Sequence, residues 1–177
     1  MTVNKKPRPD LAAVELLVLD VDGVLTDGRL IVHDDGSESK AFHTLDGHGI
    51  RLWQRAGLKV ALLSGRHSGA TQRRAEELDI SYVLQDCHLK RPALERLLDE
   101  IGLQAQNVAY VGDDLPDLPP MRFVGFAVAV ANAVEEVKAQ ADYVTTCPGG
   151  GGAVREVIEH ILKGSGRWEP LMQRYLA

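Results

Sequence analysis

The chain has 177 residues, and its 20 lysines and arginines against 25 aspartates and glutamates give a formal net charge of −5. This length favours one domain over residues 1–177, and 45% hydrophobic residues are too many for a disordered chain. The negative charge disfavours nucleic acid as a partner, because phosphate backbones are bound by dense lysine and arginine faces. No apolar stretch approaches the roughly 18 residues that a membrane-spanning helix needs, so no membrane partner is expected.

The compartment follows from the N-terminus and the cysteines. Basic residues within positions 1–8 precede an apolar run, but Glu15 and Asp20 interrupt that run, unlike the apolar region of a secretion signal. Cys87 and Cys147 form neither a disulfide framework nor a metal-ligand spacing. We therefore expect a cytoplasmic protein with reduced thiols.

Short apolar runs alternate with polar or amphipathic segments along the chain. The runs are typical of buried parallel strands, and we expect strands at 16–19, 60–63 and 108–111, with weaker ones at 126–130 and 143–145. Helices are expected at 67–79, at 92–101 with Gly102 ending it, at 133–140 and at 153–162. The segment 29–43 carries a turn signal at 34–37 and predicts a β-hairpin, part of a flap over about 28–44. The alternation predicts a doubly wound α/β sheet with ligands at the carboxyl ends of its strands.

The strongest chemical signal is the pair Asp20 and Asp22, which directly follows the first expected strand. At a strand end both carboxylates would face one crevice, where the first can attack phosphorus and the second can exchange protons. Gly23 would let the backbone approach a ligand closely. The alternative for such a pair is an acidic turn.

Ser64, Gly65 and Arg66 end the second long strand, and Lys90 precedes a helix. A hydroxyl with free backbone N–H groups can bind a phosphoryl oxygen. Lys90 can neutralise a phosphoryl group and a nucleophilic carboxylate. The alternatives are a helix N-cap for Ser64, a helix-surface charge for Arg66 and an ordinary surface lysine for Lys90.

The third strand ends in an acidic cluster made of Asp113, Asp114 and Asp117. Carboxylates this close repel one another, so they imply either a bound cation or full solvation. Because the cluster offers only oxygen ligands, Mg²⁺ is the expected ion.

Together, the order DxDGxLTDG, SGR, lysine and GDDLPD resembles the haloacid dehalogenase superfamily of phosphatases over residues 16–163. The resemblance implies an Mg²⁺-dependent phosphomonoesterase that forms an aspartyl-phosphate. It implies that Asp20 is the nucleophile and Asp22 the acid/base, and that Ser64 and Lys90 bind phosphate. It also implies that Mg²⁺ binds Asp20, Asp113 and the backbone carbonyl of Asp22, with Asp114 and Asp117 nearby.

A narrower resemblance concerns the size of the chain and four of its stretches. Residues 23–63 leave space for a hairpin and a helix but not for a large cap, and KAFHTLDGHGI, NVAYVGDDLPDLP, ADYVT and GAVREV are similar to the 3-deoxy-D-manno-octulosonate 8-phosphate phosphatases. That family hydrolyses a phosphorylated eight-carbon sugar acid on the route to the lipopolysaccharide inner core. It is capless and usually homotetrameric, which implies a homo-oligomer here.

Two departures leave alternatives open. The family usually has arginine at the position of Gly151 and a short polar residue before the lysine, where this chain reads HLK. A nonulosonate 9-phosphate phosphatase or a broader sugar phosphatase is therefore an alternative. A receiver-like phosphoacceptor domain is the alternative from another class, although there the phosphorylated aspartate follows a later strand.

Three further features have two interpretations each. His43 and His48 flank a turn near the expected site, so they are either substrate contacts or surface histidines. The glycine run 149–152 either presents N–H groups to an anion or forms a flexible loop. The tail 164–177 carries an apolar stripe at helical spacing that packs either on its own core or on a neighbouring subunit, formed by Trp168, Leu171, Met172, Tyr175 and Leu176.

Overall fold

The computed structural model describes residues 9–176, so the basic residues near the N-terminus and Ala177 lie outside the described part. Its centre is a six-stranded parallel sheet in the order β5-β4-β1-β6-β7-β8. The strands are β1 (Leu16–Leu19), β4 (Lys59–Leu63), β5 (Tyr82–Leu84), β6 (Val108–Gly112), β7 (Phe126–Ala129) and β8 (Tyr143–Val144).

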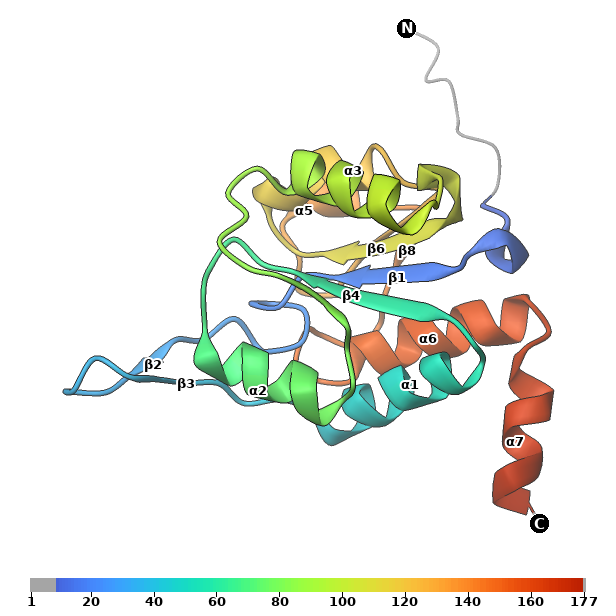
Figure 1. The fold of residues 1–177 in the computed structure, drawn as a ribbon, viewed down its shortest axis with the longest axis horizontal. Coiled ribbons are helices and arrows are strands. Elements are labelled where there is room, and N and C mark those ends of the chain that lie inside the picture. Colours follow the sequence, from blue (N-terminus) through green and yellow to red (C-terminus); the bar gives the residue numbers. More distant parts are fainter. Residues whose placement is uncertain (1–8, 177) are drawn as a thin grey trace, which may run out of the picture.

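Helices cover both faces of this sheet (Figure 1). One face carries α1 (Thr44–Arg55), α2 (Gly69–Glu77) and α6 (Ala153–Gly164); the other carries α3 (Lys90–Ile101) and α5 (Glu135–Lys138). The short helix α4 (Leu118–Met121) follows β6. This arrangement confirms the doubly wound α/β fold.

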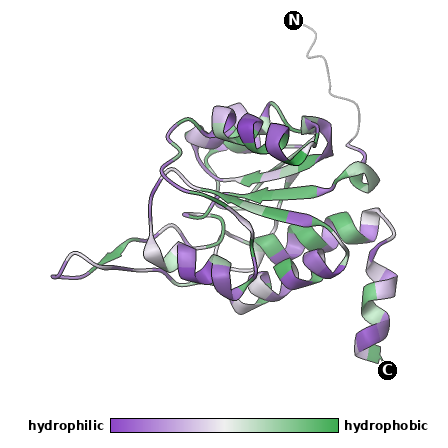
Figure 2. Cartoon of the chain, in the orientation of Figure 1, coloured by the Kyte–Doolittle hydropathy of each residue, from purple (hydrophilic) through white to green (hydrophobic). Residues whose placement is uncertain are grey.

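The pattern of burial explains why these segments form strands and helices. All four side chains of β1 are fully buried, as expected for a central strand that is covered on both faces. Apolar residues follow the sheet and the inner faces of the helices, whereas the outer faces of α2 and α3 are polar (Figure 2). Trp53 of α1 and Tyr110 of β6 are the largest fully buried side chains among the described residues.

The elements differ from the sequence predictions at several places. The edge strand β5 was not predicted; it has only three half-buried residues and pairs with β4 alone. The helix expected at 133–140 is confined to Glu135–Lys138. The helix expected from Pro92 begins two residues earlier, at Lys90, and α4 was not predicted at all.

A hairpin separates β1 from α1, as predicted. Strands β2 (Ile31–Val32) and β3 (Glu38–Ser39) pair antiparallel and project from the body of the molecule (Figure 1). Because only this hairpin and α1 lie between β1 and β4, that part of the chain holds no large cap.

The C-terminal helix α7 (Trp168–Leu176) points away from the layers (Figure 1). Trp168 and Leu171 are partly buried against the core, but Tyr175 and Leu176 are 45% and 84% exposed. Packing on its own core thus covers only part of the apolar stripe. Between residues 9 and 176, no helix has the length and apolar character that crossing a membrane requires.

Candidate active site

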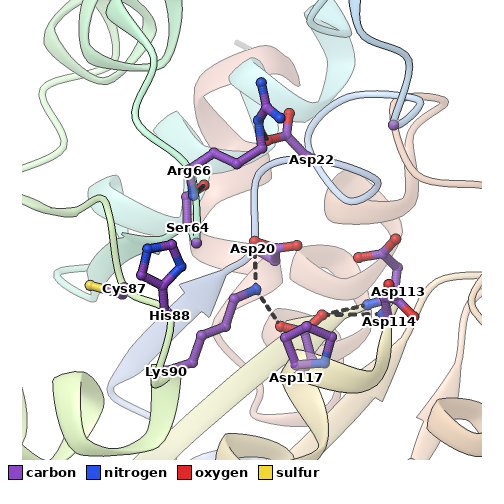
Figure 3. A pocket seen from close by; sticks show the side chains of 13 residues that line it. Asp20, Asp22, Ser64, Arg66, Cys87, His88, Lys90, Asp113, Asp114 and Asp117 are labelled. Atoms are coloured by element: carbon purple, nitrogen blue, oxygen red, sulfur yellow. Dashed lines mark hydrogen bonds and ion pairs between the residues drawn. The ribbon is translucent and has the colours of Figure 1, made fainter.

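The topology places three strand ends together. Strand β1 lies between β4 and β6, so the loops after these strands meet at one edge of the sheet. They enclose a cavity of about 390 Å³ (Figure 3). Its lining includes Asp20, Asp22, Ser64, Gly65, Arg66, Lys90, Asp113, Asp114 and Asp117, together with Gly28, Cys87, His88 and Pro116. Every predicted site residue except Gly23 therefore lines one cavity.

Asp20 and Lys90 form a buried ion pair. The Lys90 Nζ lies 2.8 Å from Asp20 Oδ1, and the Lys90 and Asp20 side chains are 5% and 9% exposed. Burial raises the pKa of Asp20 to about 6, Asp117 also acts to raise it, and Lys90 opposes both. Burial alone would lower the pKa of Lys90, but Asp20 and Asp117 raise it above its ordinary value. The surface-lysine interpretation is wrong, because this ammonium lies inside the site.

Asp117 connects Lys90 to the acidic loop. Its Oδ1 accepts hydrogen bonds from Lys90 Nζ at 2.6 Å and from the Tyr110 hydroxyl at 2.7 Å. Its Oδ2 accepts from the backbone N–H groups of Asp113 at 3.0 Å and Asp114 at 3.3 Å. Both oxygens are thus engaged, so Asp117 is suited to fixing the loop and Lys90. Tyr110 was not predicted as part of the site.

Asp113 is the acid that fits a metal ion best. Its Oδ1 is buried without a hydrogen-bond partner in the described part of the chain. Oxygens of Asp20, Asp113 and Asp117 lie within 4.8 Å of one another. Burial, then Asp20 and Asp117, raise the pKa of Asp113 to about 8. Clustered, partly desolvated oxygens of this kind suit a hard divalent cation such as Mg²⁺.

Asp114 differs from its neighbours in the acidic loop. It is exposed, and its Oδ1 accepts from the Leu115 N–H at 2.8 Å at the start of a 3-10 turn, Leu115–Asp117. Asp114 thus faces solvent, whereas Asp117 is 1% exposed.

Gly23 lies directly against Asp113. Its φ is +96°, a conformation that favours glycine, and a Cβ at this position would lie 2.0 Å from Asp113 Oδ2. The loop after β1 and the acidic loop after β6 thus touch through a residue without a side chain.

The glycine run packs behind the loop that follows β1. A Cβ on Gly149 would lie 1.7 Å from the carbonyl oxygen of Gly23. The N–H groups of the run donate within the protein: Gly149 to Asn132 Oδ1, Gly150 to the Val24 carbonyl, Gly151 to the Pro148 carbonyl and Gly152 to Asp46 Oδ2. The anion-binding interpretation is therefore wrong, because these groups already have acceptors.

Ser64 is buried in the pocket wall, and its Oγ accepts from the Arg66 N–H at 3.2 Å. The N-cap residue of α2 is Ser68, so the N-cap interpretation of Ser64 is wrong. The Cys87 N–H donates to the Ser64 carbonyl at 3.0 Å and ties the loop before α3 to this strand end. The Ser64 hydroxyl proton can therefore serve a ligand in the cavity.

Asp22 is held by two cations, one of which the sequence did not point to. Lys40 Nζ donates to Asp22 Oδ1, and Arg66 Nε lies 3.8 Å from Asp22 Oδ2. Arg66 also pairs with Glu38 of the hairpin. Figure 3 shows Asp22 and Arg66 together, apart from the chain of interactions that joins Asp20, Lys90 and Asp117. Lys40 and Glu38 were missed because charged residues in a hairpin arm look like solvent-facing ones.

His43 and His48 are not among the residues that line the cavity. His43 is the N-cap of α1, where its Nδ1 accepts from the Leu45 N–H at 3.3 Å. His48 Nε2 lies 3.0 Å from the Tyr175 hydroxyl in α7. Burial, then Arg155 and Arg55, lower the pKa of His48. His88, which was not singled out, lines the cavity instead (Figure 3).

Comparison with known proteins places this arrangement in a class. Residues 85–158 match the haloacid dehalogenase-like hydrolase family. The 3-deoxy-D-manno-octulosonate 8-phosphate phosphatase KdsC of Escherichia coli (strain K12) is 44% identical over 154 residues, which cover 87% of this chain and 82% of that protein.

Two solved structures of phosphatases closely resemble this chain in fold and sequence. The Moraxella catarrhalis 3-deoxy-D-manno-octulosonate 8-phosphate phosphatase, in complex with magnesium ion, phosphate ion and KDO, has a TM-score of 0.91 and 41% identity, covering 93% of this chain and 95% of that one. The cobalt-bound Haemophilus influenzae phosphatase has a TM-score of 0.89 and 38% identity, and the match covers 94% of this chain and 99% of that one. The chain belongs to the 3-deoxy-D-manno-octulosonate 8-phosphate phosphatase family of haloacid dehalogenase-like hydrolases. The receiver-domain alternative is therefore wrong.

Proposed function

We propose that the protein is an Mg²⁺-dependent phosphatase that hydrolyses 3-deoxy-D-manno-octulosonate 8-phosphate to 3-deoxy-D-manno-octulosonate and phosphate, a step of lipopolysaccharide biosynthesis. The observation that carries the proposal is the Asp20–Lys90 pair at the end of β1, with Asp22 two residues further on in the same cavity. Relatives of this sequence are named for this activity.

The site supports a reaction in two halves. A carboxylate oxygen of Asp20 attacks phosphorus, the bond between phosphorus and the sugar oxygen breaks, and Asp22 gives its proton to that oxygen. A water molecule then gives a proton to the Asp22 carboxylate while the water oxygen attacks phosphorus. The bond between Asp20 and phosphorus breaks, phosphate leaves and both aspartates return to their initial states.

The surrounding groups hold the phosphoryl group. The Lys90 ammonium lies beside Asp20 and offsets negative charge on the nucleophile and the phosphoryl oxygens. The Ser64 hydroxyl and the backbone beside Gly65 can donate to those oxygens, and Arg66 lies at the Asp22 side of the cavity. We place the sugar acid on that side.

The donor set fits the metal of the proposal. Asp20, Asp113 and the backbone carbonyl of Asp22 would hold Mg²⁺, and the unpartnered Asp113 Oδ1 supports this assignment. When bound, the ion supplies positive charge that lets an anionic ester approach a cluster of carboxylates. The related Moraxella catarrhalis structure holds magnesium, and the Haemophilus influenzae structure holds cobalt.

A substrate panel tests the proposal. We expect the highest kcat/KM for 3-deoxy-D-manno-octulosonate 8-phosphate, and loss of turnover in a folded Asp20→Asn variant. Because glycine stands at position 151, a nonulosonate 9-phosphate and simple sugar phosphates belong in the panel. A preference for the nonulosonate ester, or similar values for every ester, would establish the corresponding alternative instead.

We further propose a homo-oligomer, most simply a tetramer, in the cytoplasm. The hairpin exposes Leu30, Ile31 and Val32 at 48%, 49% and 64%, and burying such side chains favours association. Both cysteines are free thiols, which supports a reducing compartment. Light scattering that finds a monomer at micromolar concentration would contradict the oligomer.

A further inference from the structure

The hairpin contacts the acid/base Asp22 through one buried lysine. Lys40 directly follows β3, its side chain is 1% exposed, and its Nζ donates to Asp22 Oδ1. The other oxygen, Asp22 Oδ2, has Arg66 Nε at 3.8 Å. One oxygen of Asp22 is thus tied to the hairpin, while the carboxyl group still lines the cavity.

Each aspartate of the pair has its own lysine, but the two lysines differ. Lys90 begins α3 on one face of the sheet, and its buried ammonium bonds Asp117 as well as Asp20, so it is fixed from two sides. Within residues 9–176, the Lys40 ammonium bonds Asp22 alone. A buried ammonium without any acceptor is strongly destabilised, so the hydrogen bond from Lys40 to Asp22 Oδ1 is expected to persist both when Oδ2 carries a proton and when it does not.

Resting on the proposed function, we propose that Lys40 is a positioning residue for Asp22. By holding Oδ1, it fixes the carboxyl group so that Oδ2 carries the proton to the sugar oxygen in the first half-reaction and takes the proton of water in the second. The hairpin therefore sets the position of the acid/base, while the core sets the position of the nucleophile.

A purely structural role for Lys40 as an anchor of the hairpin makes a different prediction. Loss of an anchor would weaken substrate binding or stability without slowing one chemical step more than the other. Loss of a positioning contact slows proton transfer in particular. Because p-nitrophenolate leaves without needing a proton, p-nitrophenyl phosphate can form the aspartyl-phosphate normally, and only its hydrolysis then depends on Asp22.

The experiment compares Lys40→Met with wild type and Lys40→Arg. Methionine fills a similar volume without the charge, and Ser39→Ala is a matched control because it removes only the exposed His33–Ser39 bond of the same hairpin. For the sugar acid phosphate we expect Lys40→Met to lower kcat by about 100-fold with little change in KM. We expect Lys40→Arg to recover part of kcat and Ser39→Ala to match wild type.

Pre-steady-state kinetics separate the two chemical steps. With p-nitrophenyl phosphate, Lys40→Met should release a burst approaching one p-nitrophenol per active site, larger than the wild-type burst, because hydrolysis of the aspartyl-phosphate becomes limiting. A kcat close to wild type, or a lower kcat without an increased burst, would overturn the proposal. If Lys40→Met does not fold, Lys40→Gln is judged by the same two measurements.

The proposed substrate and the proposed role of Lys40 can fail separately. If the wild-type protein turns over p-nitrophenyl phosphate but not the sugar acid phosphates, the substrate assignment is wrong. The burst comparison then still decides the role of Lys40, since it uses the aryl ester alone.

Discussion

Replacing Gly23 by alanine tests how closely the catalytic loop must approach the acidic loop. The new Cβ would lie 2.0 Å from Asp113 Oδ2 and 2.6 Å from its Cγ. Ordinary contacts between heavy atoms lie at about 3.5 Å, so the Asp113 carboxyl group would have to move by more than about 1 Å. Its unpartnered Oδ1 would move with it, away from the place where we expect the metal.

Two costs can be separated in this variant. The positive φ of +96° adds about 1–2 kcal/mol of backbone strain for alanine, which lowers Tm by a few degrees in a chain of this size. Displacement of Asp113 adds a functional cost, because a misplacement of about 1 Å at a reacting centre lowers the rate by roughly 100-fold. We therefore expect a modest loss of stability and a large loss of kcat, with more Mg²⁺ needed for half-maximal activity.

Gly57→Ala is the matched control. Gly57 has a similar φ of +79°, but a Cβ at this position would have nothing within 4 Å, so alanine adds strain without a clash. Thermal unfolding and Mg²⁺ titrations of turnover are measured on both variants. We expect similar losses of Tm but activity loss only for Gly23→Ala; if Gly23→Ala keeps wild-type turnover and Mg²⁺ dependence, the argument from close approach is wrong.

Three further predictions concern the metal and the supports of the site. Exhaustive EDTA treatment should abolish turnover and added Mg²⁺ should restore it; full activity after chelation would contradict the metal assignment. For Glu156, burial alone would raise the pKa, but hydrogen bonds from Thr146, Cys147 and Tyr143 lower it to about 2, below its ordinary value of 4.5. Glu156→Gln should therefore lower the free energy of unfolding by about 1–3 kcal/mol above pH 4.5. The difference from wild type, measured by urea unfolding, should shrink as pH falls towards 2, and a difference independent of pH would contradict this prediction. Asp46 accepts hydrogen bonds from the backbone N–H groups at the start of α6. Asp46→Ala should therefore lower the free energy of unfolding by about 1–2 kcal/mol in the same urea assay. An unchanged urea midpoint would contradict its capping role.

The strand ends of the site could be predicted from sequence because each follows a local pattern. The runs at 16–19, 60–63 and 108–111 are buried on both faces, so their apolar character is continuous, and the polar residues that follow them mark the carboxyl edge. Strand β5 lacks this signal, since an edge strand of three half-buried residues has neither length nor continuous burial.

Other parts of the site depend on contacts between distant residues. Tyr110 looks like an ordinary strand residue, and only the fold brings its hydroxyl to Asp117. The glycine run was visible, but its function as a close-packed support of the loop after β1 depends on the approach of Gly149 to Gly23. Lys40 gave no signal, because burial of a hairpin lysine is decided by the position of Asp22, 18 residues earlier in the chain.

The lysines that contact Asp20 and Asp22 belong to different parts of the fold. Lys90 begins α3, which packs on the sheet, and its ammonium bonds Asp117, which in turn binds Tyr110 and the backbone of the acidic loop. Lys40 belongs to a hairpin that projects from the body of the molecule (Figure 1). Substitutions that disturb the hairpin should therefore change proton transfer through Asp22 while leaving the nucleophile and the metal ligands in place. Such variants would bind phosphate and Mg²⁺ normally and yet turn over slowly, the reverse of what we expect for Gly23→Ala.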